Sequence, residues 1–316
     1  MRHSLAPIHC RPWTLNSLSL RLVESHYENN YGGAVRRLNA IASQLEALDP
    51  ASAPPALYNA LKREELVALN STLLHELYFA SLGGDGQPNG ALADALAHDF
   101  GSVDRWRTEF VAMAHGLGGG SGWVVLTYVP RDGRLINQYA SEHSQSIASG
   151  VPVLALDMYE HAYHIDFGAN ARAYVDTYFR NIDYSALLAR YEDARQSLPP
   201  RPLVQPEFDI ASVAVEEVRA MMASGKPVQV IDVRPRHSLS RQQDIADGVT
   251  WRDPEQVEQW MGELSKEAPV VVYCVYGFHV GCKTAIKLRD AGFDAKFMSG
   301  GHEAFKAVGH PLKIAM

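Results

Sequence analysis

Two stretches near the N-terminus repeat apolar residues at helical spacing. Apolar side chains recur at steps of three and four residues between Leu15 and Leu48, and again from about Arg63 to Leu82. A period of this kind is typical of a helix that buries one face. Residues 49–55 between them contain prolines, which end helices. We therefore predict an antiparallel α-helical hairpin within residues 1–90.

Apolar runs of strand length follow the two helical stretches. Residues 151–156 form one such run, which ends at Asp157 and predicts a buried strand in an α/β part at 91–196. Beyond residue 206, the mainly apolar segment 228–231 and the apolar run 270–273 alternate with helical patterns. That succession is typical of a parallel sheet flanked by helices.

A proline-rich segment separates the two patterns. Residues 197–206 contain four prolines, which fit neither a helix interior nor a central strand and favour an extended connector. We therefore predict a multidomain protein of the α and α/β classes. A linker at 197–206 joins the first domain to a second α/β domain, with a parallel sheet, at 207–316.

Composition narrows the classes of protein to consider. The 316 residues include 29 Lys and Arg against 36 Asp and Glu, and the resulting net charge of −7 argues against a nucleic-acid binder. No apolar run reaches the roughly 18 residues that span a bilayer, and the first residues lack the apolar core of a secretory signal. Cys10, Cys274 and Cys282 are too few for a disulfide framework. We expect a soluble cytoplasmic protein that binds neither nucleic acid nor membrane.

Four residues of the first domain are candidate metal ligands. His26 and His75 each lie in the middle of a predicted helix, and inward-pointing histidines on facing helices suit a divalent metal. Asp157 and His161 are four residues apart where strand passes into helix. Such a mixed nitrogen and oxygen set favours iron or manganese. Taken singly, Asp157 is equally explained as a helix cap and each histidine as a core or surface residue.

Three segments resemble the iron/manganese superoxide dismutase family. Residues 157–163, Asp-Met-Tyr-Glu-His-Ala-Tyr, are similar to its Asp-x-Trp-Glu-His-Ala-Tyr signature, with Tyr159 in place of the Trp. Residues 170–174, Asn-Ala-Arg-Ala-Tyr, are similar to its Asn-x-Arg-x-x-Tyr motif, with one residue fewer between the Arg and the Tyr. Residues 75–79, His-Glu-Leu-Tyr-Phe, fit the ligand on its second helix. The resemblance covers nearly all of residues 1–196.

This resemblance implies an activity and a set of site residues. The activity is dismutation of superoxide to dioxygen and hydrogen peroxide at one iron or manganese ion per subunit, which is a function in oxidative stress. The implied metal ligands are His26, His75, Asp157 and His161. The resemblance further implies that Tyr78 and Trp123 line the cavity, and that Glu160 and Tyr163 lie at the interface of a homodimer.

The chain departs from the family at positions around the metal. Asn30 and Ala34 stand where the family usually has a His and a Tyr, and Asn29 stands where a basic residue is common. The solvent-binding Gln of iron-type enzymes corresponds to Ser71 here. Manganese-type enzymes supply this group from a later loop, where His143 and Gln145 are the candidates, although His143 is equally explained as a solvated loop residue. We favour iron, with manganese as the alternative.

One cysteine of the second domain is a candidate nucleophile. Cys274 follows a predicted strand and precedes a predicted helix, which places it at the carboxyl end of a parallel sheet. Loop amides and the helix dipole at such a position favour a thiolate or a persulfide. The alternative is a small buried residue at a strand end, which is the commoner fate of a cysteine.

Segments of the second domain resemble the rhodanese family over most of residues 207–316. They are Val-Ile-Asp-Val-Arg at 230–234, the Cys274 loop, and Met-Ser-Gly-Gly-His-Glu-Ala-Phe at 298–305. The resemblance implies Cys274 as a sulfur acceptor, with a small sulfur donor or a thiol as its partner. The chain departs from the usual Cys-x-x-Gly-x-Arg loop because His279 stands in place of the Arg. Cys282 either resolves an oxidised Cys274 or faces the helix core.

Together these observations predict a superoxide dismutase fused to a rhodanese-like module for sulfur transfer or thiol redox chemistry. The alternative is a thiol or sulfurtransferase protein whose dismutase-like half is mainly a dimerising metal-binding scaffold with weak activity. The substitutions at Asn30 and Ala34 motivate that alternative.

Overall fold

A computed structural model describes residues 2–198 and 210–314 of the chain. Contacts divide it into two compact units, Met1–Pro202 and Leu203–Met316, which are described separately. Residues 199–206 of the predicted linker lie outside the described residues, and the first two linker positions, Ser197 and Leu198, end the last helix of the first unit. Every helix in the described ranges is too short or too polar to span a lipid bilayer.

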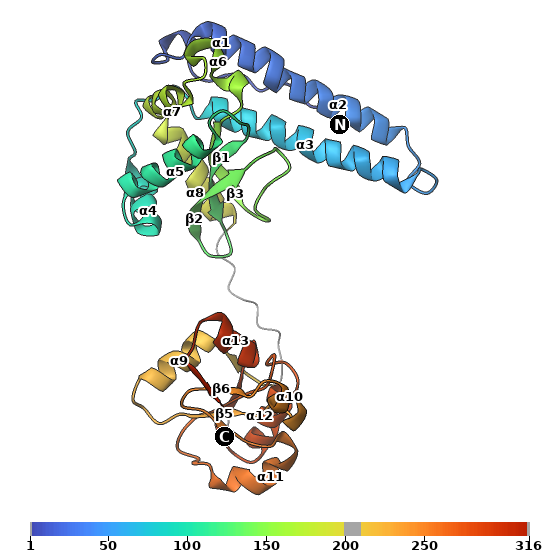
Figure 1. Ribbon diagram of the computed structural model, residues 1–316, viewed down its shortest axis with the longest axis vertical. Coiled ribbons are helices and arrows are strands. Elements are labelled where there is room, and N and C mark those ends of the chain that lie inside the picture. Colours follow the sequence, from blue (N-terminus) through green and yellow to red (C-terminus); the bar gives the residue numbers. More distant parts are fainter. Residues whose placement is uncertain (1, 199–209, 315–316) are drawn as a thin grey trace. The chain divides into compact units, whose positions relative to one another are not determined.

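The first unit begins with the predicted helical hairpin. Its first arm is built from α1 (Leu20–Ser25), the π-helical turn η2 (His26–Tyr31) and α2 (Gly32–Glu46), and its second arm is α3 (Pro55–Ala80). Figure 1 shows α2 and α3 lying side by side.

The two arms begin at positions that differ from the predicted ones. The first starts at Leu20 and not at Leu15, because the side chain of Ser19 caps it by accepting a hydrogen bond from the Leu22 amide. The second starts well before Arg63, at Pro55, since proline fits the first turn of a helix.

The rest of the first unit packs helices around a three-stranded antiparallel sheet of order β2-β1-β3. These elements are η1 (Pro12–Thr14), α4 (Gly90–Phe100), α5 (Val103–Leu117), β1 (Trp123–Val129), β2 (Arg134–Ala140), β3 (Val151–Asp157), η3 (Glu160–Ala162), α6 (His164–Phe167), α7 (Ala171–Arg180) and α8 (Tyr184–Ser197). In the register of β1 and β3, Trp123 lies opposite Asp157. The central strand β1 thus brings a large aromatic residue to the end of β3.

The second unit is a five-stranded parallel sheet of order β4-β9-β8-β5-β7 with helices on its two faces. Its strands are β4 (Ser212–Val213), β5 (Gln229–Asp232), β7 (Thr250–Trp251), β8 (Val270–Tyr273) and β9 (Ala295–Met298), with β6 (Asp244–Ala246) and β10 (Leu312–Ile314) forming a separate antiparallel pair. Its helices are α9 (Val215–Ala223), α10 (Arg236–Arg241), η4 (Pro254–Gln256), α11 (Val257–Trp260), η5 (Met261–Glu263), α12 (Val280–Asp290) and α13 (Gly301–Ala307). The predicted fold class is confirmed.

The central strand β8 explains the continuous apolar run in the sequence. Val270 and Val272 belong to the apolar cluster on one face of the sheet, whereas Val271 and Tyr273 belong to the cluster on the other. A strand that is covered on both faces has no polar side to alternate with.

A buried ion pair fixes the end of β5. Asp232 and Arg234 are both fully buried, and the Arg234 side chain donates to Asp232 through Nε at 2.8 Å. The same guanidinium donates to the backbone carbonyls of Gln242 and Asp244, which lead into β6. Arg234 therefore ties two strands of different sheets together.

Replacing Arg234 by alanine leaves a buried carboxylate without its partner, so we expect the second unit to lose about 3–5 kcal/mol of unfolding free energy. Hydrogen exchange at the β5 and β8 amides of the full chain, with urea denaturation, measures the loss. Arg236→Ala is the control, because Arg236 is an exposed partner of Asp253 and its removal costs about 1 kcal/mol or less. Equal losses in the two variants would contradict a special role for the buried pair.

Candidate metal centre and cysteine loop

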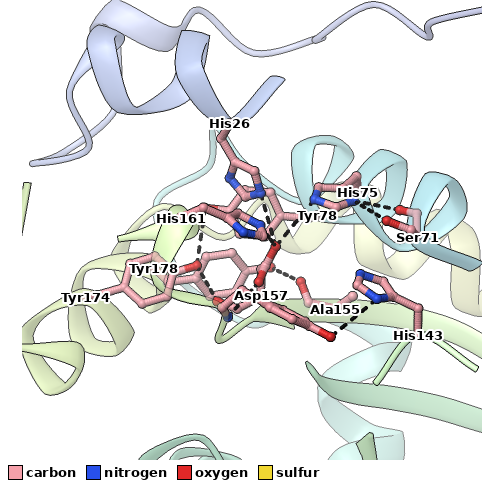
Figure 2. Close-up of polar contacts among 11 residues, drawn as sticks. His26, Ser71, His75, Tyr78, His143, Ala155, Asp157, His161, Tyr174 and Tyr178 are labelled. Carbon is pink, nitrogen blue, oxygen red and sulfur yellow. Dashed lines mark hydrogen bonds and ion pairs between the residues drawn. The ribbon is translucent and has the colours of Figure 1, made fainter. Parts of the chain in front are cut away.

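Four side chains from separate elements converge in the core of the first unit. His26 begins η2, His75 lies in α3, Asp157 ends β3 and His161 lies in η3. Their possible ligand atoms all lie within 4.8 Å of one another. The Nε2 atoms of His26, His161 and His75 are 3.0, 3.2 and 3.5 Å from Oδ2 of Asp157 (Figure 2).

The π-helical turn η2 lies at the first of these residues. It follows α1 directly and runs into α2, so that His26 stands where the helix changes its hydrogen-bond pattern. Single π turns within α-helices are frequent at functional sites. The sequence pattern predicted one continuous helix here, because apolar residues four apart, such as Tyr27 and Tyr31, fit an α-helix and a π turn alike.

Burial sets the protonation of the cluster. It lowers the pKa of His26, and it lowers the pKa of His75 to about 3. Burial alone would raise the pKa of Asp157, but hydrogen bonds from His161 and His26 bring that pKa far below its ordinary value. Near neutral pH, His26 and His75 are thus neutral imidazoles and Asp157 is a carboxylate, which are the forms that bind metals.

The orientation of His75 is fixed by the backbone of its own helix. Its Nδ1 lies 2.6 Å from the carbonyl oxygen of Ser71, and because a carbonyl only accepts, Nδ1 carries the proton. The lone pair is then on Nε2, which is buried and has no hydrogen-bond partner among the described residues. A buried acceptor without a donor, beside a carboxylate and two more imidazoles, fits a bound cation.

A further set of contacts holds Asp157 in place. The Tyr159 amide donates to Oδ1 of Asp157 at 2.9 Å, and the Tyr174 hydroxyl donates to its backbone carbonyl at 2.9 Å. The hydroxyls of Tyr174 and Tyr78 are 3.3 Å apart, and the Tyr78 ring packs 4.9 Å from that of His26. These contacts fix the end of β3 and with it the carboxylate.

The two loop candidates of the sequence occupy different surroundings. The His143 ring stacks 5.0 Å from Tyr159 and lies 6.3 Å from His75, and the Asn70 side chain holds its backbone carbonyl at 2.6 Å. Burial lowers the pKa of His143. Gln145 bonds within its own loop, where its side-chain oxygen accepts hydrogen bonds from the Ser141 amide and hydroxyl. His143 therefore faces the cluster, whereas the Gln145 side chain forms hydrogen bonds within its own loop.

The remaining candidates around the cluster, Trp123, Glu160 and Tyr163, also differ in their surroundings. The Trp123 ring is 5.2 Å from that of His75 and 5.7 Å from that of His143, so it covers the cluster from the sheet side. Glu160 is exposed beside His161. The Tyr163 side chain is buried and stacks on Tyr174 of the same chain.

A pocket of about 300 Å³ opens beside the cluster. His75, His143 and His161 line its inner end, while Asn30 and Ala34 line it from the first arm of the hairpin. The small Ala34 side chain leaves this space open, where the dismutase family usually has a tyrosine. A small molecule in the pocket therefore reaches the cluster directly.

The second unit presents Cys274 at the base of a loop. Cys274 follows β8 and is 5% exposed, and the loop ends at Val280, where α12 begins. Gly277 has a φ of 76°, and a Cβ there would lie 2.2 Å from the carbonyl oxygen of Met298. Gly301 has a φ of 55°, and a Cβ on this residue would lie 2.3 Å from the carbonyl oxygen of Cys274. Only glycine allows this backbone contact between the Cys274 loop and the turn before α13.

Two aromatic residues of this loop were not singled out from the sequence. Tyr276 and Phe278 are 58% and 71% exposed, and their rings stack with centroids 5.9 Å apart. Both flank Gly277, and an aromatic residue on each side of a loop glycine is the signal that could have drawn attention to them. The three cysteines of the chain are free thiols.

Comparison with known proteins agrees with both halves of the sequence interpretation. Residues 88–190 match the family model described as iron/manganese superoxide dismutases, C-terminal domain, and residues 214–308 match the rhodanese-like domain. An iron superoxide dismutase of Cupriavidus metallidurans is 58% identical over 194 residues, which are 61% of this chain and 98% of that protein.

More distant relatives include enzymes named for each metal. An iron superoxide dismutase of Aquifex pyrophilus is 32% identical, over 62% of this chain and 94% of that protein. A manganese superoxide dismutase of Halobacterium salinarum is 35% identical, over 56% of this chain and 88% of that protein. The chain thus belongs to the iron/manganese superoxide dismutase family and carries a rhodanese-like domain after its dismutase part.

Proposed function

We propose that the first unit converts two superoxide ions and two protons into dioxygen and hydrogen peroxide. The observation that carries this proposal is the convergence of three imidazole Nε2 atoms on one buried carboxylate oxygen. The 58% identity to a protein named iron superoxide dismutase supports the same activity. His26, His75, Asp157 and His161 would hold the metal. A bound iron or manganese ion supplies the one-electron couple that both halves of the reaction need.

The side chains of the pocket position the substrate and manage protons. His143 lines the pocket, and its buried Nε2 has no hydrogen-bond partner among the described residues. Burial lowers the pKa of His143, so near neutral pH one ring nitrogen donates while the other accepts. We assign His143 as the group that hydrogen-bonds to small molecules at the inner end of the pocket. Trp123 and Tyr78 keep this end dry, because both are buried against ligand histidines.

Iron is the proposed metal. The relative at 58% identity is named an iron enzyme, whereas the manganese-named enzyme of Halobacterium salinarum is 35% identical. Manganese is the alternative, since relatives named for both metals match the same part of the chain.

A homodimer in the cytoplasm is the proposed state of the protein. Glu160 is exposed beside His161, whose side chain is 29% exposed, so a second copy could cover both residues. We place Tyr163, which stacks on Tyr174, at the same interface. The free cysteines support a reducing compartment.

For the second unit we propose sulfur transfer through Cys274. The thiolate attacks the outer sulfur of a donor such as thiosulfate, which forms a cysteine persulfide and releases sulfite. A thiol or cyanide then takes the outer sulfur and regenerates the thiolate. The position of Cys274 at the carboxyl end of β8, before the N-terminus of α12, supports this role because loop amides there stabilise negative charge on sulfur.

The second candidate function makes this thiol chemistry the main activity and leaves the first unit as a metal-binding scaffold with weak dismutase activity. The observation that favours it is the open wall of the pocket at Asn30 and Ala34, which presents no ionisable side chain to substrate.

Replacing His75 by alanine removes one nitrogen from the cluster, so we expect the metal content and the dismutase rate to fall together. Elemental analysis of protein expressed with both metals available, with a superoxide assay, measures the two. His98→Ala is the control, because the His98 side chain is 84% exposed. Full metal content in His75→Ala would contradict the ligand set, whereas wild-type protein with stoichiometric iron and no dismutation would contradict the activity.

Replacing His143 by alanine removes a hydrogen-bonding group but no proposed ligand. We expect the dismutase rate per bound metal to fall about 100-fold, as for loss of a positioned proton donor, with metal content retained. Glutamine can still donate and accept, so His143→Gln should recover part of the rate. Unchanged rates in both variants would remove His143 from the mechanism.

Replacing Cys274 by serine should abolish transfer of sulfur from thiosulfate to cyanide and the mass increase of one sulfur atom after incubation with thiosulfate. Cys10→Ser is the matched control, because Cys10 is a free thiol of the first unit. Transfer that persists in Cys274→Ser would rule out this nucleophile.

A further inference from the structure

The pocket beside the cluster must attract an anion although the chain is acidic. Superoxide carries one negative charge, and the formal net charge of the chain is −7. Asn29 and Asn30, which line the pocket, supply no positive charge. Long-range attraction of a small anion therefore depends on individual basic groups at the pocket itself.

Arg37 has the right position for this task. Among the described residues that line the pocket, Arg37 is the only lysine or arginine. It lies three residues after Ala34 in α2, which places both on the same side of the helix. The Arg37 side chain is 58% exposed, so its guanidinium stands at the outer end of a pocket whose inner end is lined by His75, His143 and His161.

An acidic residue from the other arm of the hairpin forms an ion pair with the Arg37 guanidinium. Glu64 of α3 forms an ion pair with Arg37, and its other oxygen lies 3.2 Å from Arg63. Arg63 in turn lies 3.5 Å from Glu142, the neighbour of His143. Glu64 thus holds the Arg37 guanidinium in place but also offsets part of its positive charge.

We propose that Arg37 attracts superoxide and other small anions into the pocket, and that Glu64 weakens this attraction while orienting Arg37. This inference rests on the proposed dismutase activity, whose substrate it concerns, but anion binding tests it separately. Arg37 acts on the encounter with substrate and is a steering residue, not a ligand or a proton donor.

The effect of one exposed charge on an encounter rate is moderate and depends on salt. Steering by several charges changes association rates 10- to 1,000-fold, so a single arginine accounts for about three- to fivefold at low ionic strength. The Debye length is about 30 Å at 0.01 M salt and about 8 Å at 0.15 M, so the effect should shrink as salt is added.

The first experiment measures kcat/KM for superoxide by pulse radiolysis of the iron-loaded full chain, normalised to metal content, between about 0.01 and 0.15 M salt. We expect Arg37→Gln to lower the rate about three- to fivefold at low salt and to show a flatter salt dependence. Arg37→Lys should retain most of the rate, and Glu64→Gln should raise it. Arg131→Gln is the control, because it removes an equal charge from an 83% exposed side chain that does not line the pocket.

The second experiment needs no turnover. Azide, a small anion, is titrated into the same iron-loaded proteins and followed by absorbance. We expect Arg37→Gln to weaken azide binding about threefold at low salt, with little change in Arg131→Gln.

The outcomes separate the inference from the proposed activity. Weaker azide binding in Arg37→Gln supports steering even if wild-type protein proves inactive, which would contradict only the dismutase proposal. An Arg37→Gln protein that matches wild type in rate, salt dependence and azide affinity would overturn the inference. A rate loss of the same size at every salt concentration would also overturn it, because that is the signature of a structural role.

Discussion

The carboxylate of Asp157 lies in the apolar core of the first unit, with three histidine nitrogens between 3.0 and 3.5 Å from one of its oxygens. An ionised carboxylate in such a place costs several kcal/mol unless other groups compensate its charge. Hydrogen bonds from His26 of the first arm and His161 of η3 compensate this charge, whereas the second arm brings the acceptor nitrogen of His75 to the same oxygen and the carboxylate itself ends β3. These elements therefore have to meet at one point, and the need to satisfy this carboxylate shapes the packing of the whole unit.

The surroundings of the carboxylate keep it in a single position. Tyr159 and Tyr174 bond to the side chain and to the backbone of Asp157, and Trp123 lies opposite it in the sheet. A slip of β3 by one residue would turn Asp157 to the other face of the sheet and separate it from the histidines. The register of β3, the burial of Asp157 and its distance from the histidines therefore depend on one another. The large aromatic side chains around Asp157 fix all three.

Much of this arrangement could be predicted from sequence because it rests on local patterns. The helical spacing predicted the hairpin, and the apolar run before Asp157 predicted β3, although both arms of the hairpin begin at positions set by Ser19 and Pro55. The π turn at His26 was missed, since apolar residues four apart fit an α-helix and a π turn alike.

Residues whose role depends on packing across elements were harder to place. The sequence could not distinguish His143 from Gln145, because the choice depends on which side chain its loop turns inward. The stacking of Tyr163 on Tyr174, a residue of another helix, likewise could not be read from local spacing. Arg37 was not identified as a candidate from the sequence, because only the folded hairpin places its side chain at the pocket between α2 and α3.

Gly277 and Gly301 allow a close backbone contact that holds the Cys274 loop against the turn before α13. The position of Cys274 is set by main-chain packing against the turn before α13, whereas Tyr276 and Phe278 point into solvent from the same loop. The backbone contact that places Cys274 therefore does not involve these two side chains, which stack on each other. Substitution at these two aromatic positions changes the exposed surface beside Cys274 but leaves in place the glycines that fix the course of the loop.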